Sequence, residues 1–309
     1  MKAKLKVITL LCIILLSSGC TKYVKDGNKA VIYEETGQTI TANILCKPEE
    51  PELVELYEKH NVEIINQVPT CKDFKLGSGE YSSLWESLLV KPLAYVILKV
   101  GYLVKNMGLS VMIVGLLIRL IMLPFSRKSM LQSENLKKAQ PEIAKLEKKY
   151  KNKTDKESLM MKSQETMFIY KKYNINPVSG CLLAFIQLPL FFAFLEAINR
   201  VPAIFEGDFF FGMKLGMTPW VGISNGQYIY ILLIALIILS TYFSFKKTMN
   251  SQANGEMEKQ MQFMMKFMII MISLASFSLP TAIALYWIVT NTFAVFQNII
   301  INKSLEKRK

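Results

Sequence analysis

The chain has 309 residues, is 51% hydrophobic and carries a formal net charge of +13, with a mean hydropathy of +0.28. Its apolar residues gather in blocks of roughly 17–25, the length that crosses a hydrocarbon core, which argues against an ordinary soluble domain. In a membrane protein, surplus Lys and Arg collect in cytoplasmic loops. We favour this explanation of the charge over nucleic-acid binding and expect no DNA partner.

Residues 1–19 have a basic start, an apolar run and then small residues. This pattern predicts a secretory signal peptide rather than a membrane span. The small residues directly before Cys20 resemble a bacterial lipobox, so we expect Cys20 to be lipidated and to become the mature N-terminus. The alternative is an uncleaved apolar anchor.

Residues 20–83 form a polar segment, in which residues 21–81 hold seven lysines against eleven carboxylates. A translocated segment need not be basic, so we place it outside the cell. It is short for a hydrophobic core of its own. Residues 51–60 fit one helix, and the rest is rich in loops. A disulfide between Cys46 and Cys71 is possible in an oxidising compartment, but the sequence leaves it open.

Residues 84–105 form an apolar stretch with one polar and aromatic stripe. Its members recur at steps of three or four residues, which places them on one helical face: Lys91, Tyr95, Lys99, Tyr102 and Asn106. Such a stripe is typical of a helix in the membrane interface.

Residues 126–173 are the most charged part of the chain, with thirteen Lys and Arg against six carboxylates. Their apolar positions keep helical spacing, interrupted near residues 152–155, where Thr154 or Asp155 could cap a second helix. We therefore predict a cytoplasmic helical hairpin, and its positive charge sets the orientation of the protein.

Five membrane spans are expected, at about residues 108–125, 178–197, 228–245, 263–279 and 282–301, within a membrane domain of residues 84–303. A basic cytoplasmic tail follows at residues 304–309. If the chain starts outside, five crossings place every strongly basic loop on one side. The predicted fold class is an all-α polytopic membrane protein, a five-transmembrane-helix bundle with a cytoplasmic hairpin and an interfacial amphipathic helix.

Arg119 is the most informative residue, because it is embedded in the first expected span. It precedes Arg127 of the basic loop by eight residues, or about 12 Å along a helix. A charge at the bilayer centre costs about 2.5–3.5 kcal/mol on insertion scales, so we expect Arg119 to face a hydrated cavity. The alternative is snorkelling to the cytoplasmic surface. Glu196, near the outer end of the second span, is expected to pair with Arg200 at i+4.

Polar and aromatic residues of other spans could line the same cavity. Gln187 lies in the middle of the second span. Trp287 and Asn291 share one face of the fifth span, with Tyr286 beside it. Buried amides often just join neighbouring helices, but together with Arg119 they indicate a hydrated groove. No Cys/His cluster has metal-ligand spacing, and we expect no cofactor.

Several motifs resemble the YidC/Oxa/Alb family of membrane protein insertases, in particular its Gram-positive lipoprotein members. In chain order they are LIRLIMLP at residues 117–124, QPEI at 140–143, KY at 149–150, YNINP at 173–177, GC at 180–181, IQLP at 186–189, LP at 279–280, ALYW at 284–287 and QN at 297–298. One departure is Leu183-Ala184, where relatives often have a proline, so the start of the second span could be straighter here.

The resemblance implies a five-helix bundle around a groove that is open to the cytoplasm and to lipid but closed outside. Arg119 would attract acidic or polar parts of an incoming chain, and Gln187 and Trp287 would line its path. The implied partners are nascent membrane proteins and membrane lipids. The basic hairpin and tail are candidates for contact with ribosomes or targeting factors, and the sequence does not decide whether a Sec translocon takes part.

A small-molecule or ion transporter is the main alternative. It would usually show ionisable relay residues within spans, or two similar halves. We find neither pattern in this sequence. A membrane enzyme is a weaker alternative because no catalytic cluster is recognisable, and we expect no enzymatic activity.

Overall fold

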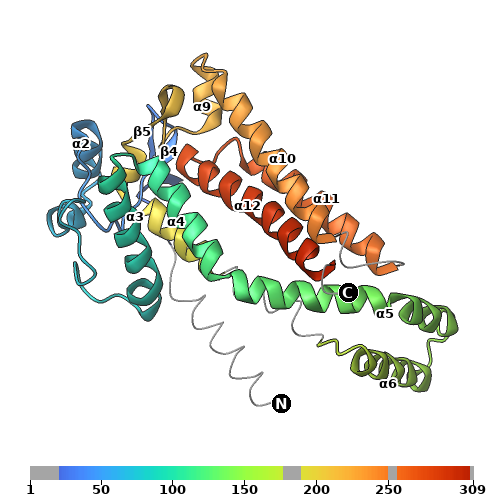
Figure 1. Ribbon diagram of the computed structural model, residues 1–309. Coiled ribbons are helices and arrows are strands. Elements are labelled where there is room, and N and C mark those ends of the chain that lie inside the picture. Colours follow the sequence, from blue (N-terminus) through green and yellow to red (C-terminus); the bar gives the residue numbers. More distant parts are fainter. Residues whose placement is uncertain (1–20, 177–188, 250–255, 307–309) are drawn as a thin grey trace. The chain divides into compact units, whose positions relative to one another are not determined.

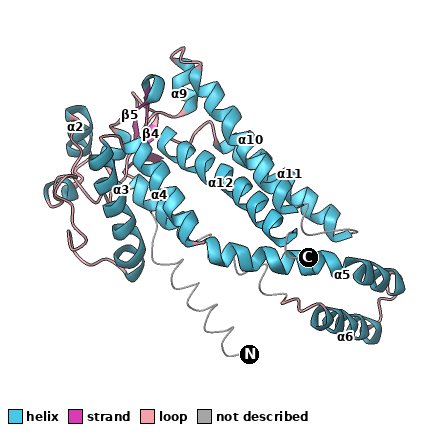
Figure 2. Ribbon diagram, in the orientation of Figure 1, coloured by secondary structure: helices cyan, strands magenta, loops and turns pink. Residues whose placement is uncertain are grey.

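The computed structural model describes residues 21–176, 189–249 and 256–306. The described chain is mostly helical, with a few two-residue strands (Figures 1 and 2). The prediction of an all-α membrane protein is confirmed at this level. The leader, Cys20, Cys181 and Gln187 lie outside the described residues.

The chain divides into two compact units. The first comprises Met1–Leu117, Gln187–Ile237 and Leu274–Thr290, and the second comprises Ile118–Ile186, Ile238–Ser273 and Asn291–Lys309. Four described helices have residues in both units: α4 (Met107–Ile121), α10 (Ile229–Met249), α11 (Glu256–Ala275) and α12 (Thr281–Glu306).

The N-terminal segment of the first unit contains two short antiparallel hairpins. Strand β1 (Lys25–Asp26) pairs with β2 (Lys29–Ala30), and β3 (Ile32–Tyr33) pairs with β4 (Gln38–Thr39). Helix α2 (Pro51–Lys59) and the 3-10 turn η1 (Glu63–Asn66) follow. The expectation that this segment lacks a core was wrong, because the hairpins and α2 bury one apolar cluster between them: Val24, Val31, Tyr33, Ile40, Ile44, Leu53, Tyr57 and Ile65.

The expected interfacial helix corresponds to a π-helical turn η2 (Glu86–Val90) followed by α3 (Lys91–Val104). It ends at Lys105, which adopts a left-handed conformation (φ 55°). Lys99 and Tyr102 of the predicted stripe are exposed, and the Lys99 ammonium lies 5.5 Å from the centre of the Tyr95 ring. Lys91 departs from the stripe, since it is buried and ion-paired with Glu86.

The first expected span corresponds to α4, which ends at Ile121, four residues before the expected boundary. Pro124 explains the break, because a proline lacks the N–H that would continue the helical hydrogen bonds and is tolerated only in the first turn of a helix. The next helix, α5 (Leu123–Lys149), accordingly begins with this proline.

Helices α5 and α6 (Lys156–Lys172) form the predicted hairpin (Figure 1). Asp155, one of the two capping residues that the sequence offered, caps α6 by accepting a hydrogen bond from the Ser158 amide at 2.8 Å. A small apolar core joins the two helices: Ala139, Leu146, Tyr150 and Ile169. Lys149 pairs with Glu165 at 2.6 Å, and Lys172 pairs with Glu142 at 2.5 Å.

The remaining described elements are a helix at Pro189–Asn199, α8 (Pro202–Phe205), β5 (Asp208–Phe209), the 3-10 turn η3 (Phe210–Gly212), β6 (Met213–Lys214), α9 (Pro219–Ser224), α10 (Ile229–Met249), α11 (Glu256–Ala275) and α12. Strands β5 and β6 form an antiparallel hairpin. Residues 200–228, between the helix Pro189–Asn199 and α10, are thus a structured connection.

Within the described residues, three helices are long and apolar enough to cross a membrane: Glu86–Val104, Ile229–Lys246 and Thr281–Ile301. A fourth candidate is the bent pair α4 and α5. Two shorter apolar helices, Pro189–Asn199 and Met265–Ala275, fall at the expected second and fourth spans. The helix assigned to the interface is therefore also long enough to span, and the exact number of five spans stays a prediction.

Candidate functional site

Tyr286 and Trp287 lie in an aromatic cluster of the first unit. The ring of Tyr286 stacks on Phe194 with centroids 4.1 Å apart, and Trp287 meets Phe191 edge-on at 5.4 Å. Tyr286 is only 4% exposed, whereas Trp287 is half-buried. Tyr286 thus packs the fifth-span helix against the helix Pro189–Asn199, while Trp287 keeps an accessible surface.

Helix α4 approaches α12 closely at Gly115. A Cβ at this position would lie 2.9 Å from Cδ2 of Tyr286 and 3.3 Å from Cγ2 of Thr290. Small residues of this kind allow two membrane helices to pack at short range. The contact fixes which face of α4 is turned toward α12.

Arg119 lies one helical turn after Gly115, in the second unit, and is half-buried. Residues four apart share a helix face, so Arg119 is on the face of α4 that carries Gly115. Asn291 lies one turn after Trp287 on α12, also half-buried and also in the second unit. Gln187 falls outside the described residues.

A buried charge cluster of the first unit was only partly predicted. We call its members, Glu86, Lys91, Glu196 and Arg200, the Arg200 cluster; all four are buried. The predicted pairing of Arg200 with Glu196 is confirmed, at 2.9 Å between Nη1 and Oε1. Arg200 Nη2 also lies 2.6 Å from Glu86 Oε2, and Lys91 Nζ lies 3.3 Å from Glu86 Oε1. The two acids and two bases therefore balance.

The Arg200 cluster joins three parts of the chain. Trp85, next to Glu86, donates from Nε1 to Glu196 at 2.8 Å. Arg200 Nε donates to the Asn43 carbonyl at 2.6 Å, and the Leu45 amide donates to the Arg200 carbonyl at 2.8 Å. Arg200 thus ties the N-terminal segment to the start of the interfacial helix and to the helix Pro189–Asn199. The sequence signal that could have revealed the cluster was Glu86 so close to Lys91 in an apolar stretch.

A cavity of about 790 Å³ lies beside the Arg200 cluster. Its lining combines the four cluster residues with polar groups of the N-terminal segment, among them Lys22, Asn43 and Ser83. The balanced charges of its wall make it a polar space rather than a site for one strongly charged ligand.

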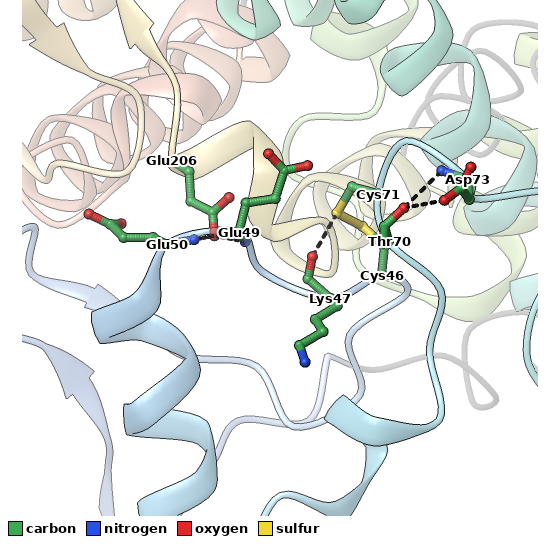
Figure 3. Close-up of a disulfide and its surroundings, with 8 residues drawn as sticks. All are labelled: Cys46, Lys47, Glu49, Glu50, Thr70, Cys71, Asp73 and Glu206. Atoms are coloured by element: carbon green, nitrogen blue, oxygen red, sulfur yellow. Dashed lines mark hydrogen bonds between the residues drawn. A yellow bond between two sulfur atoms is a disulfide. The ribbon is translucent and has the colours of Figure 1, made fainter.

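The N-terminal segment is fastened to residues 200–218 at further points. The Thr218 amide donates to the Thr36 carbonyl at 2.8 Å, and Lys214 forms an ion pair with Glu35. Glu206 Oε1 accepts hydrogen bonds from the amides of Glu49 and Glu50, at 2.9 and 3.3 Å (Figure 3). These contacts make residues 22–74 a fixed part of the first unit.

Cys46 and Cys71 are joined by a disulfide in the structure, next to the Glu206 contact (Figure 3). The bridge closes a loop of 25 residues that contains α2 and η1. Closing such a loop in the unfolded chain corresponds to about 3 kcal/mol of stabilisation on the chain-entropy account.

We therefore expect the mature protein to contain no reactive thiol at Cys46 or Cys71 until a reductant is added. Thiol counting on unfolded protein, with and without reductant, measures this in a variant with Cys181→Ala. Reduction should also lower the thermal stability of the N-terminal segment. Two reactive thiols in protein kept oxidised would contradict the bridge.

Burial raises the pKa of Glu206 from 4.5 to about 6, and the nearby Glu49 and Glu50 add to the effect. The folded state therefore holds this proton more tightly than the unfolded chain, so stability should fall as pH rises from about 4.5 through 6, by at most about 2 kcal/mol. Glu206→Gln, which keeps a carbonyl acceptor without the charge, should flatten this dependence. Melting temperatures at pH 5 and pH 7.5 test it.

Glu58→Gln provides the control, because Glu58 is exposed on α2 of the same segment. It should leave the difference in melting temperature between the two pH values as in the wild type. An unchanged difference in Glu206→Gln would show that the buried carboxyl does not set the pH dependence.

The fold and these residues define a polytopic helical membrane protein with a half-buried arginine near the end of an apolar helix. Residues 99–308 match the family described as 60Kd inner membrane protein. The chain is 34% identical over 230 residues to a membrane protein insertase YidC of Oceanobacillus iheyensis, covering 73% of this chain and 86% of the relative. The chain therefore belongs to the YidC family of membrane protein insertases.

Two further relatives support the same family. A membrane protein insertase YidC 2 of Listeria innocua is 34% identical over 229 residues, covering 74% of this chain and 75% of the relative. The membrane protein insertase MisCA of Bacillus subtilis is 34% identical over 218 residues, covering 70% and 78%. The main prediction from the sequence, a membrane protein insertase whose substrates are membrane proteins, is confirmed at the level of the family.

Proposed function

We propose that this chain inserts membrane proteins through a polar groove in which Arg119 receives the hydrophilic part of the incoming chain. The observation that carries the proposal is a half-buried arginine inside an apolar helix. A charge at such a position is expensive and marks a functional site by default. Membership of an insertase family supplies the reaction that it would serve.

The physical advantage of a groove is that the polar tail of a client crosses a shorter distance of hydrocarbon. A polar tail that passes through hydrocarbon loses its hydration without compensation, at several kcal/mol for each unsatisfied group. A hydrated groove that reaches part of the way across the bilayer keeps the tail solvated over that distance. The guanidinium adds attraction for carboxylates, and it can bind them with two parallel hydrogen bonds.

The other residues of the groove have separate roles in this proposal. Gln187 and Trp287 line the path, and Asn291, one turn beyond Trp287, extends the polar face of α12. Tyr286 positions α12, because its ring packs against Phe194 and the backbone of α4 at Gly115. The chain needs neither a nucleotide nor a metal for this work.

The topology that we propose follows from charge. Residues 126–173 and the tail at residues 304–309 lie in the cytoplasm, since both are basic. The acidic segment of residues 20–83 lies outside, anchored by a lipid on Cys20 after removal of residues 1–19. The basic hairpin is then available to ribosomes, targeting factors or a Sec translocon.

Photocrosslinking during translation tests the groove. A photoreactive amino acid at Gln187 or Asn291 should form adducts with a ribosome-bound client whose transmembrane segment has just emerged. The matched control is Leu239 of α10, an exposed apolar position that should crosslink to lipid. Adducts no stronger at the two groove positions than at Leu239 would reject the groove, even if the protein still inserts clients.

A further inference from the structure

We propose that the tip of the β5–β6 hairpin, Phe210 and Phe211, is an anchor that inserts into the lipid interface where α4 and α12 begin. The two rings are 58% and 86% exposed. The neighbouring Phe209 and Met213 are half-buried and buried. The hairpin therefore turns two residues inward and presents two large rings outward.

Phe211 adopts a backbone conformation that phenylalanine rarely takes. Its φ is 63° and its ψ is 26°, in the left-handed region that favours glycine. A bulky residue there is a clear outlier, and such strain persists only where something outweighs it. A ring that is almost fully exposed gains little from the rest of the chain, so its stabilising contact must come from outside the molecule.

The base of the hairpin is fixed at the first residues of two membrane helices. Asn106, just before α4, donates from Nδ2 to the Asp208 carbonyl at 3.5 Å. A Cβ on Gly108 of α4 would lie 2.5 Å from the Phe209 ring. After β6, the Leu215 carbonyl accepts a hydrogen bond from the Ala282 amide of α12 at 3.0 Å. The tip is therefore held at the level where these helices meet the membrane surface.

Other exposed aromatic residues mark the same level. Trp220 on α9 is 65% exposed, and Tyr228, directly before α10, is 72% exposed. Aromatic rings at the ends of membrane spans typically lie at the headgroup level. Asp208 and Lys214 are opposite one another in the register of the two strands, at the base of the hairpin. The hairpin is therefore polar at its base and apolar at its tip. A polar base with an apolar tip matches the headgroups and the hydrocarbon of a lipid surface. It matches a uniformly apolar protein interface less well.

An environment-sensitive fluorescent amino acid at position 211 tests the anchor in the full-length protein. The protein is reconstituted into vesicles of phosphatidylethanolamine and phosphatidylglycerol whose acyl chains are brominated near the headgroup end. Emission should shift to the blue and be quenched several-fold more strongly than from the same probe at Ile32. Ile32 is the control because it is an exposed apolar residue of the N-terminal hairpins.

Each other outcome overturns the proposal. Equally weak quenching of the probes at positions 211 and 32 would place the tip in water. A blue shift without bromine quenching, measured at high dilution of protein in lipid, would mean that the tip is covered by protein instead, such as a second copy.

Phe211→Gly separates anchoring from folding, because glycine adopts the left-handed conformation without strain. This variant should melt in detergent no lower than the wild type. With the probe moved to position 210, quenching by the brominated lipids should fall relative to the same probe beside Phe211. Undiminished quenching would remove Phe211 from the anchor.

Discussion

Replacing Arg119 by Ala should reduce insertion at least about tenfold, the loss that about 1.4 kcal/mol of transition-state interaction represents. The protein level should not fall, because the change removes a charge that is costly in the bilayer. Arg119→Lys should keep much of the activity, although a single ammonium cannot form the two-pronged contact of a guanidinium. The measurement is insertion of a reporter in a depletion strain, with protein abundance determined in parallel.

Two outcomes would count against this account. Normal insertion by Arg119→Ala at normal abundance would leave snorkelling as the better explanation of the residue. Loss of the Ala variant itself would indicate that Arg119 stabilises the fold rather than serving clients. Asn291→Ala provides a comparison, since it changes a half-buried polar residue of the same unit without altering charge.

Replacing Arg200 by Met should destabilise the first unit by about 3–5 kcal/mol, the loss typical when one partner of a buried ion pair is removed. Glu86 and Glu196 would then remain buried with Lys91 as the single base of the Arg200 cluster. The same change removes the hydrogen bond to Asn43, so the N-terminal segment should become sensitive to protease. Thermal unfolding in detergent and limited proteolysis measure the two effects.

Lys214→Met is the matched control, because Lys214 pairs with Glu35 at a partly exposed position of the same unit. Exposed pairs contribute about 0–1 kcal/mol, so the melting temperature should barely change. Adding only Glu196→Gln to Arg200→Met should recover part of the lost stability, since Glu86 and Lys91 would then remain as one buried acid paired with one buried base. A melting temperature of Arg200→Met equal to that of the control would show that the Arg200 cluster does not stabilise the first unit.

The sequence predicts best where one physical signal dominates. The hairpin α5–α6 follows from helical spacing and from a capping residue before its second helix, and the apolar runs locate the candidate membrane spans. The early end of α4 was missed, although Pro124 is visible in the sequence, because a hydropathy pattern continues across the break to Phe125.

The N-terminal segment and the Arg200 cluster depend on contacts between residues far apart in the chain. The short strands of the N-terminal segment carry too few residues for an alternating pattern. The core of this segment forms only when the hairpins and α2 meet. Lys91 fitted an interfacial stripe by its spacing. Glu86 nearby in the sequence was a local signal for a pair with Lys91, but nothing local revealed that Arg200 would join them. Tyr286 was assigned to the groove because it is polar. In the structure its ring is buried against Phe194 and Gly115.

The central claim, attraction of an incoming polar segment by the charge at Arg119, is tested most directly by exchanging charges. Proteoliposomes containing the wild type or Arg119→Glu are offered two clients that differ only in an acidic or a lysine-substituted translocated tail. The account predicts a reversed preference: the wild type inserts the acidic tail better, and Arg119→Glu inserts the basic tail better. Insertion of the acidic tail by Arg119→Glu at the wild-type rate would contradict it.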